Sequence, residues 1–269
     1  MLRFLKKVKS RIRAFIVLIM YLLSTNIKKD EVQTRVLLFH HIDSKTHFNA
    51  IVVRLSKLYN CISFNDWLNG KVVKDRYNVI ISFDDGYESW YTNAYPVLKS
   101  HGIKPLLFIN SDFIDGNKQQ SYNFCKKNIG TWEENSLTQE QLMELDEFGC
   151  QIGSHTCSHI DMQKNGFDIC FHQVNTDRER LSSIVKSKVS IFAYPFGRVS
   201  KQALKAVEGS GITYAFCTKS GFLEKSESSF LLNRTNVGMR SPIIVSAYVE
   251  GHLDAFTKYV KSLKNLWRN

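Results

Sequence analysis

VIISFDDG, from Val79 to Gly86, is an apolar run that ends in two adjacent carboxylates and a glycine. The apolar part is continuous rather than alternating, which is typical of a parallel strand covered by helices. Adjacent carboxylates repel each other, so both stay ionised only if a cation lies between them or one is protonated. The stretch therefore predicts a buried strand that ends with Asp84 and Asp85 beside a divalent metal. The alternative is a helix N-cap, because Asp before Gly-Tyr-Glu is common where a helix begins.

Further apolar runs and helix-like stretches alternate along the rest of the chain. The other predicted strands are 36–39, 106–109, 150–153, 189–194, 212–217 and 230–232. The predicted helices are 47–59, 88–100, 138–148, 168–186, 200–209 and a packing helix over 244–267. Thr138 and Gln141 form a capping box before the third of these helices. About seven strand–helix units without a nucleotide-binding glycine motif predict an α/β fold, a barrel or a distorted barrel.

Residues 110–137 are the main irregular insertion. They follow the third predicted strand, so in a parallel barrel they overhang the C-terminal face, where active sites lie. A loop of this length inside an enzyme is usually functional, and the alternative is a surface excursion with its own small apolar patch.

Composition favours one large domain with a basic start. The chain has 269 residues, 43% of them hydrophobic, and 36 basic against 25 Asp and Glu residues, a formal charge of +11. Six of the basic residues lie among the first thirteen, which favours anionic lipid as a partner. Nucleic acid is disfavoured, because no basic stripe with interleaved aromatics and no zinc-finger spacing follows. The six cysteines contain no C-x-x-C pair and indicate buried thiols in a reducing compartment.

The basic start continues into ten apolar residues, 14–23. This run is short for a membrane span, which needs ~20 residues. We expect residues 1–30 to form a membrane-associating segment, either interfacial or short-spanning, with the cytoplasmic membrane as the first choice and its face undecided. The alternatives are an export signal, although no clean cleavage site follows, and a first core helix of the domain.

A second string, SHTCSH over residues 154–159, places two imidazoles four residues apart. His155 and His159 can face one point if the residues between them form one helical turn. Together with Asp85 they make a half-closed shell that leaves positions for water and substrate, as catalytic metal sites do. Cys157 is a less favoured ligand, because two residues from His155 it would usually point away.

A third string, YPFG over residues 194–197, ends the predicted strand at 189–194. A proline and a glycine that bracket an aromatic residue form a rigid turn. Such a turn can aim the Phe196 N–H at a developing oxyanion. Ordinary loop chemistry is the alternative.

These strings, in this order, resemble the polysaccharide deacetylase family, the NodB homology domain of carbohydrate esterase family four. The resemblance covers roughly residues 35–235 and implies an incomplete (β/α)7 barrel, with the catalytic domain over 31–269. In that family the first Asp of the pair is the general base and the second binds the metal with the two histidines. The corresponding residues are Asp84 as base, Asp85, His155 and His159 as ligands of a divalent metal, by default zinc, and Phe196 as the oxyanion N–H donor.

Departures from the family pattern leave the general acid open. Ala193 stands where the family has an Arg in the third motif, the fourth motif is not visible, and the fifth lacks its His, reading LLNR over residues 231–234. His40 and His41, at the end of the first predicted strand, are the candidates for the acid. Arg234 is an alternative that would stabilise charge without donating a proton.

The site residues and the resemblance predict a metal-dependent hydrolase that removes an N-acyl group, first of all N-acetyl, from an amino sugar in a polysaccharide or glycan precursor. One alternative keeps the chemistry and changes the substrate, to a lipid-linked saccharide deacylated or deformylated at the membrane surface. Another is a carbohydrate-binding protein with a decayed catalytic site. Fe(II), cobalt and nickel also suit two histidines and one carboxylate.

Overall fold

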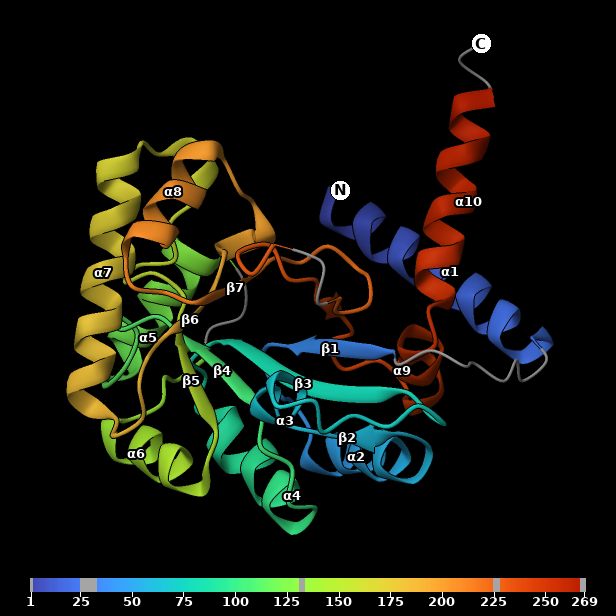
Figure 1. The fold of residues 1–269 in the computed structure, drawn as a ribbon, viewed down its shortest axis with the longest axis horizontal. Coiled ribbons are helices and arrows are strands. Elements are labelled where there is room, and N and C mark those ends of the chain that lie inside the picture. The colour runs from blue at the N-terminus through green and yellow to red at the C-terminus, as the bar shows by residue number, and fades with distance from the viewer. Residues whose placement is uncertain (1, 25–32, 131–133, 225–227, 267–269) are drawn as a thin grey trace.

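The computed structural model describes residues 2–24, 33–130, 134–224 and 228–266, except the side chains of 2–9 and 266. Over these residues the chain forms one curved sheet of eight parallel strands, surrounded by helices (Figure 1). The strands are β1 (Thr34–Phe39), β2 (Asn60–Cys61), β3 (Asn78–Asp85), β4 (Leu106–Ile109), β5 (Gln151–Ser154), β6 (Ile191–Ala193), β7 (Tyr214–Phe216) and β8 (Thr235–Asn236). Their order is β7-β6-β5-β4-β3-β1-β8, and β2 pairs with β3 beside this path.

β3 carries the stretch that predicted the fold, and all eight of its residues are buried. It pairs with β1 from Asn78 to Phe83 and with β4 from Ser82 to Asp85. A strand that is central in the sheet and covered on both faces has no exposed side to make polar, which is why its apolar run is continuous. The two carboxylates therefore come at the point where the strand reaches the C-terminal edge of the sheet.

The edges of the sheet are joined by the segment 229–236. At one end of this segment the Leu232 N–H donates to the Ala215 carbonyl next to it in β7, at 2.9 Å, and at the other end β8 pairs with β1. The sheet is therefore the incomplete (β/α)7 barrel that the family resemblance implies. The predicted strand at 230–232 is wrong in extent, because a turn leaves Leu232 with only an isolated bridge and the regular pairing falls at β8.

Most predicted helices are present, with two differences. The helices are α1 (Leu2–Leu23), α2 (Lys45–Leu58), α3 (Phe64–Leu68), α4 (Tyr95–Ser100), α5 (Lys118–Phe124), α6 (Gln139–Phe148), α7 (Phe167–Ile184), α8 (Lys201–Gly209), α9 (Pro242–Val249) and α10 (His252–Leu266), with π-helical turns η1 (Trp90–Ala94) and η2 (Cys125–Ile129) and 3-10 turns η3 (Met162–Lys164) and η4 (Pro195–Gly197). The predicted helix at 88–100 begins as the π-helical turn η1. The predicted helix at 244–267 is divided into α9 and α10, because the chain turns at Gly251 with a φ of 87°. Thr138 and Gln141 form the predicted capping box of α6.

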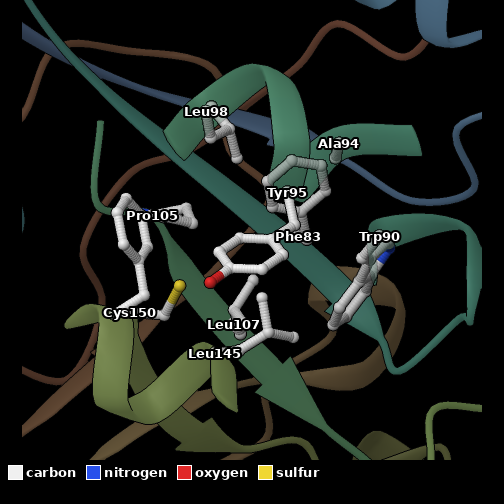
Figure 2. Close-up of a pocket in the computed structure, with 10 residues that line it drawn as sticks. Phe83, Trp90, Ala94, Tyr95, Leu98, Pro105, Leu107, Leu145 and Cys150 are labelled. Carbon is white, nitrogen blue, oxygen red and sulfur yellow. The ribbon is translucent and has the colours of Figure 1, made fainter. Parts of the chain in front are cut away.

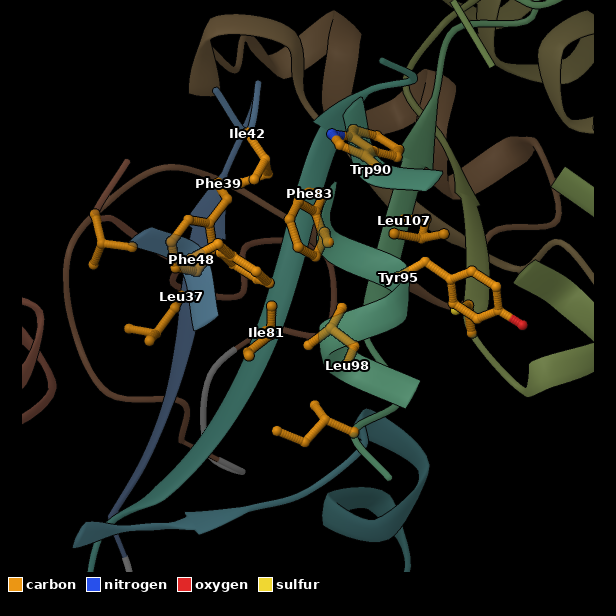
Figure 3. Close-up of a cluster of buried hydrophobic side chains, with 14 of the residues drawn as sticks. Leu37, Phe39, Ile42, Phe48, Ile81, Phe83, Trp90, Tyr95, Leu98 and Leu107 are labelled. Atoms are coloured by element: carbon orange, nitrogen blue, oxygen red, sulfur yellow. The ribbon is translucent and has the colours of Figure 1, made fainter. Parts of the chain in front are cut away.

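Aromatic rings fill the core between the sheet, α2 and η1 (Figure 3). Phe48 of α2 lies 5.5 Å from the ring of Phe39 and 6.0 Å from that of Phe83. Trp90 of η1 lies 5.5 Å from Phe83, and its indole N–H donates to the His40 carbonyl at 2.8 Å. The core therefore extends up to the residue that follows β1.

A cavity of about 10 Å³ lies beside this core (Figure 2). Its lining is almost entirely apolar and includes Phe83 of β3, Leu107 of β4, Trp90, Tyr95 and Leu145 of the covering helices, and Cys150 just before β5. A space of this size holds one water at most, and an apolar lining offers that water few partners. The cavity is a gap in the packing and contains none of the predicted site residues.

α1 forms part of the predicted membrane-associating segment, residues 1–30, and packs against α9 and α10 (Figure 1). Val17 is fully buried and Ala14 nearly so, which shows that one side of α1 belongs to the core. Among the described residues, no helix combines the length and the apolar character needed to cross a bilayer. The remainder of the segment 1–30, at residue 1 and at 25–30, lies outside the described residues.

Candidate metal centre

Two strand ends and the turn after one of them bring three possible metal ligands together. Asp85 ends β3, and His155 and His159 lie on the turn that follows β5. The Asp85 Oδ1 atom lies 3.7 Å from His155 Nε2 and 3.5 Å from His159 Nε2. One ligand atom from each residue falls within 4.8 Å of the other two, and all three residues are buried. Donors at tetrahedral angles around an ion with bonds of ~2.1 Å are about 3.4 Å apart, so the spacing suits a divalent metal.

Neither carboxylate oxygen of Asp85 forms a hydrogen bond of ordinary geometry with the described residues, although both are buried, and the Tyr87 hydroxyl is only near enough to lower the pKa of Asp85 slightly against burial. Burial raises the pKa of Asp85 to about 6, and the neighbouring charge of Asp84 acts in the same direction. A buried carboxylate without a well-formed hydrogen bond is costly, because its charge is poorly stabilised. A cation at this point would supply the missing partner, and the residues present therefore fit a divalent metal.

Both imidazoles are held in the neutral tautomer that leaves the Nε2 lone pair available to a metal. His155 Nδ1 lies 2.7 Å from the Ala193 carbonyl and His159 Nδ1 lies 3.2 Å from the Asn128 carbonyl. A carbonyl can only accept, so each Nδ1 carries the proton and each Nε2 is left with a lone pair facing Asp85. Burial lowers the pKa of His155 to about 3 and lowers that of His159 as well. Both rings are therefore neutral near pH 7.

Asn128 belongs to the insertion at 110–137, which the sequence predicts to overhang the site. The insertion is partly helical, with α5 and η2 inside it, and it contacts the site directly. Besides its carbonyl bond to His159, Asn128 donates from Nδ2 to the Ser158 carbonyl at 2.8 Å. This part of the insertion thus fixes the orientation of one candidate ligand.

Left-handed backbone conformations are concentrated at the site. Among the described residues other than glycine, five have a positive φ, and four of them lie here: Asp85 at 97°, Thr156 at 67°, His159 at 53° and Phe196 at 59°. Such conformations cost free energy and persist only where the surroundings impose them, most often at functional sites. The turn from 154 to 159 is therefore not the helical turn expected from the spacing, and the two rings converge through irregular backbone, with centroids 5.0 Å apart.

Asp177 of α7 holds the turn that carries the histidines, and the sequence analysis missed it. Its Oδ2 accepts from the Ser154 hydroxyl at 2.6 Å and from the His155 N–H at 3.1 Å, and its Oδ1 accepts from the Ser111 N–H at 2.7 Å. Asn110 donates to the His155 carbonyl at 2.6 Å, so the backbone of His155 is held at both its N–H and its carbonyl. A signal was present, because Asp177 interrupts the apolar stripe that buries α7.

Asp84 forms a two-point ion pair with Arg234. Arg234 Nη1 lies 2.5 Å from Asp84 Oδ1 and Nη2 lies 2.8 Å from Oδ2, and both side chains are buried. The guanidinium also donates from Nε to the Cys217 carbonyl and lies over the ring of Phe108. Burial alone would raise the pKa of Asp84, but the charge of Arg234 and its hydrogen bonds outweigh burial and lower the pKa. Asp84 is therefore ionised beside the candidate ligands.

The two candidates for the general acid are separated in space. His40 lies close enough to Asp84 and Asp85 for its charge to affect both carboxylates. His41 instead points to the insertion, where its Nε2 lies 3.0 Å from Glu134 Oε1. His40 is therefore the candidate whose charge acts on the two carboxylates, and His41 packs against the ring of Tyr87, with centroids 6.0 Å apart.

The remaining predicted residues are also located. The ring of Phe196 packs on His159 with centroids 4.5 Å apart, and its left-handed backbone precedes Gly197, where an added Cβ would lie 1.8 Å from the Thr218 hydroxyl oxygen. Cys157 points away, since its thiol lies 3.3 Å from the Gln173 carbonyl of α7. The aspartate pair does not cap a helix, because Ser89 takes the N-cap position of η1.

Comparison with known proteins supports the family resemblance. A family model described as polysaccharide deacetylase matches residues 71–215. YxkH of Bacillus subtilis, named a candidate polysaccharide deacetylase, is 31% identical over 188 residues, which are 69% of this chain and 57% of that protein. The poly-beta-1,6-N-acetyl-D-glucosamine N-deacetylase of Staphylococcus epidermidis is 27% identical over 148 residues, 52% of this chain and 47% of that protein. The chain thus spans about half the length of these curated relatives.

Solved structures share the barrel. IcaB from Ammonifex degensii has a TM-score of 0.67 at 20% identity, over 83% of this chain and 99% of that one. BC0361, a polysaccharide deacetylase from Bacillus cereus, has a TM-score of 0.65 at 22% identity, over 81% of this chain and 69% of that one. At these identities the likeness concerns the fold. Because the family model matches more than half of its length, the chain belongs to the polysaccharide deacetylase family.

Proposed function

We propose that this protein is a metal-dependent hydrolase that removes an N-acyl group, first of all acetyl, from an amino sugar in a polysaccharide or glycan precursor. The observation that carries the proposal is the buried carboxylate of Asp85, without a well-formed hydrogen bond, facing two neutral imidazoles. Family membership and the N-acetylglucosamine polymer in the name of the Staphylococcus epidermidis relative support this substrate class. We propose zinc as the ion, with Fe(II), cobalt and nickel as alternatives.

The chain's own residues supply the base and its orientation. A divalent ion held by Asp85, His155 and His159 supplies Lewis acidity, which lowers the pKa of water and polarises an acyl carbonyl. Asp84 takes the proton of the attacking water, as its ionised state allows. Arg234 holds both carboxylate oxygens of Asp84, so the base keeps one orientation.

The developing charge and the leaving amine need a hydrogen-bond donor and an acid. We assign the oxyanion contact to the Phe196 N–H, which lies on a strained turn next to His159. We assign the acid to His40, because its charge acts on Asp84 and Asp85, whereas His41 is paired with Glu134.

A second candidate is deacylation or deformylation of a lipid-linked saccharide. The observation that favours it is α1, whose side away from the domain exposes large apolar residues. We propose that the N-terminal segment attaches the enzyme to a membrane, with the cytoplasmic membrane as the first choice. A decayed carbohydrate-binding protein is less favoured, because the three candidate ligands lie close enough to share one ion and the lowered pKa of Asp84 suits a base.

Release of acetate or formate from a panel of free and lipid-linked N-acyl saccharides tests these proposals. The protein is assayed after chelation and after addition of zinc, cobalt or nickel. We expect metal-dependent release that His155→Ala abolishes and that His101→Ala, at an exposed position, leaves unchanged. A protein that holds one equivalent of metal and releases neither acid from any substrate would favour the binding function.

A further inference from the structure

α1 exposes a stripe of large apolar side chains on the side opposite its packed side. The outer stripe consists of Ile12, Phe15, Ile16, Ile19, Leu22 and Leu23, each between 37% and 79% exposed. At 3.6 residues per turn these positions fall within an arc of about 120°. Ala14, Val17 and Tyr21 lie on the other side, against α9 and α10. The apolar part of α1 therefore has two apolar sides, of which the domain covers one.

Positive charge borders the outer stripe. Arg11 and Arg13 are exposed and fall on its two opposite margins in the helical projection. Lys258, Lys261 and Lys264 are exposed on the neighbouring helix α10. An apolar stripe with cations at its margins suits a surface with phosphate groups above hydrocarbon, because the guanidinium groups reach the phosphates while the apolar side chains enter the lipid.

Other occupants of the stripe fit less well. Within the described part of the chain, no helix has the length and apolar character that a membrane span needs. A second copy packed through the same stripe would bring arginines of like charge together, on a chain whose formal charge is already +11.

We propose that α1 lies in the plane of an anionic bilayer, with its outer stripe at the boundary between headgroups and acyl chains and its inner side kept on α9 and α10. This inference deepens the membrane attachment in the proposed function and rests on it, but it does not depend on catalysis. Because α1 is packed on the domain, attachment fixes the orientation of the domain as well as its location.

The orientation places the site opening beside the bilayer. Ser10, near the start of α1, accepts from Arg240 at 3.0 Å, and Arg240 lies in the loop after β8. In a parallel sheet that loop lies at the same edge as the ends of β3 and β5, which carry the candidate ligands. Near the other end of α1, the Tyr21 hydroxyl accepts from Arg54 and the Tyr21 ring packs against His252. α1 therefore runs along the flank of the barrel, and the site opens along the membrane surface rather than into it.

Flotation of the full-length protein with vesicles tests the attachment. Vesicles of neutral phosphatidylcholine are compared with vesicles that contain phosphatidylglycerol, at low and high salt. We expect preferential binding to the anionic vesicles that weakens with salt, and a loss of about tenfold or more when Phe15→Glu and Ile19→Glu are combined. The matched control is Phe167→Glu with Ile169→Glu, two comparably exposed apolar residues on α7, which should bind as wild type.

Tryptophan at two positions tests the orientation. Brominated lipid should quench the tryptophan fluorescence of the Phe15→Trp protein by more than the wild-type background. The tryptophan of Tyr21→Trp, on the inner side of α1, should show no such additional quenching. Circular dichroism and bound metal confirm that each variant is folded, and the assay needs no turnover, so failure of the deacetylase proposal leaves this result interpretable. Equal binding of the outer-stripe and α7 variants, quenching at both positions, or a dimer that Phe15→Glu dissociates would overturn the proposal.

Discussion

Asp84 and Asp85 are adjacent in the chain, yet their carboxylates are stabilised by opposite means. Arg234 neutralises Asp84 through two hydrogen bonds, whereas the oxygens of Asp85 form no hydrogen bond of ordinary geometry with the described residues. One carboxylate is therefore ready to accept a proton and the other to bind a cation. The two residues should fail in different ways when each is made neutral.

Asp85→Asn should lose most of its bound metal. Asp84→Asn should keep the metal and lose turnover by roughly 100-fold or more, the scale of a general base. Elemental analysis and acetate release, measured on the same preparations, separate the two effects. An Asp84→Asn protein that is metal-loaded and fully active would show that the base lies elsewhere.

Arg234→Gln should shift the acidic limb of the pH–rate profile to higher pH. Arg234 lowers the pKa of Asp84 against burial, so its removal raises that pKa and the base becomes protonated sooner as pH falls. In the wild type the lowered pKa stabilises the folded state above pH ~4, and this contribution is lost as pH falls through the folded value.

The control for this prediction is Arg198→Gln. Arg198 pairs with Asp161 but is about half exposed, so its loss should change stability by less than ~1 kcal/mol, against about 3–5 kcal/mol for breaking the buried pair. Unfolding in urea and the pH profile are measured for both variants. An unchanged acidic limb in Arg234→Gln would remove Asp84 from the role of base.

Asp177→Ala should weaken metal binding by roughly 10- to 100-fold, the scale reported for groups that orient metal ligands. Its carboxylate holds the His155 N–H and the Ser154 hydroxyl, so without it the turn loses the contacts that aim the imidazole. Calorimetric titration of the metal-free protein measures the affinity, and Asp177→Glu tests whether a carboxylate restores it. Wild-type affinity in Asp177→Ala would make the contact purely structural.

The sequence identified the site residues that lie in short contiguous strings and missed those that depend on distant contacts. Asp85, His155 and His159 could be named because each string carries its own spacing, and the structure brings them together. Arg234 was named as a residue that could stabilise charge, but its pairing with Asp84 could not be foreseen, since the two are 150 residues apart. Asp177 acts across 22 or more residues and leaves only a polar gap in an apolar stripe.

At the scale of elements, Phe48→Ala should destabilise the protein by about 3–5 kcal/mol. Phe48 is fully buried on α2 and fills the space between the rings of Phe39 and Phe83. Val53→Ala, on the same helix but 46% exposed, should change stability by less than ~0.5 kcal/mol. Equilibrium urea unfolding gives both values, and similar losses in the two variants would contradict this account of the core.

Strands were predictable where both faces are buried, because burial makes the run apolar throughout. β1, β3 and β4 are of this kind. β2 and β8 are two residues long and leave no periodic pattern to detect. The break at Gly251 was hidden because apolar spacing continues across it from α9 into α10, whereas its positive φ is set by the tertiary turn.

At the scale of the whole molecule, bound metal should raise the midpoint of thermal unfolding. A ligand at 1,000 times its Kd stabilises by about 4 kcal/mol if it binds only the folded state. In the metal-free protein burial raises the pKa of Asp85 to about 6, against about 4 in the unfolded chain. The stability that this difference provides is complete below pH ~4 and is lost as the pH rises through 6. The increment from metal should therefore be larger at pH 7.5 than at pH 5.5. Calorimetry with and without chelator measures the midpoint of thermal unfolding at each pH, and in His155→Ala the metal should not raise it. Equal midpoints of the wild type with and without metal would contradict the site.

The segment that joins the two edges of the barrel also carries Arg234, and this couples catalytic competence to the end of folding. Contacts between residues far apart in sequence form slowly, because a long loop must close first. The Asp84–Arg234 pair spans 150 residues, so the helices of the chain can form before the base acquires its counter-ion. During refolding, activity should therefore recover later than the helical signal, and the delay would measure how long the two edges of the barrel take to join.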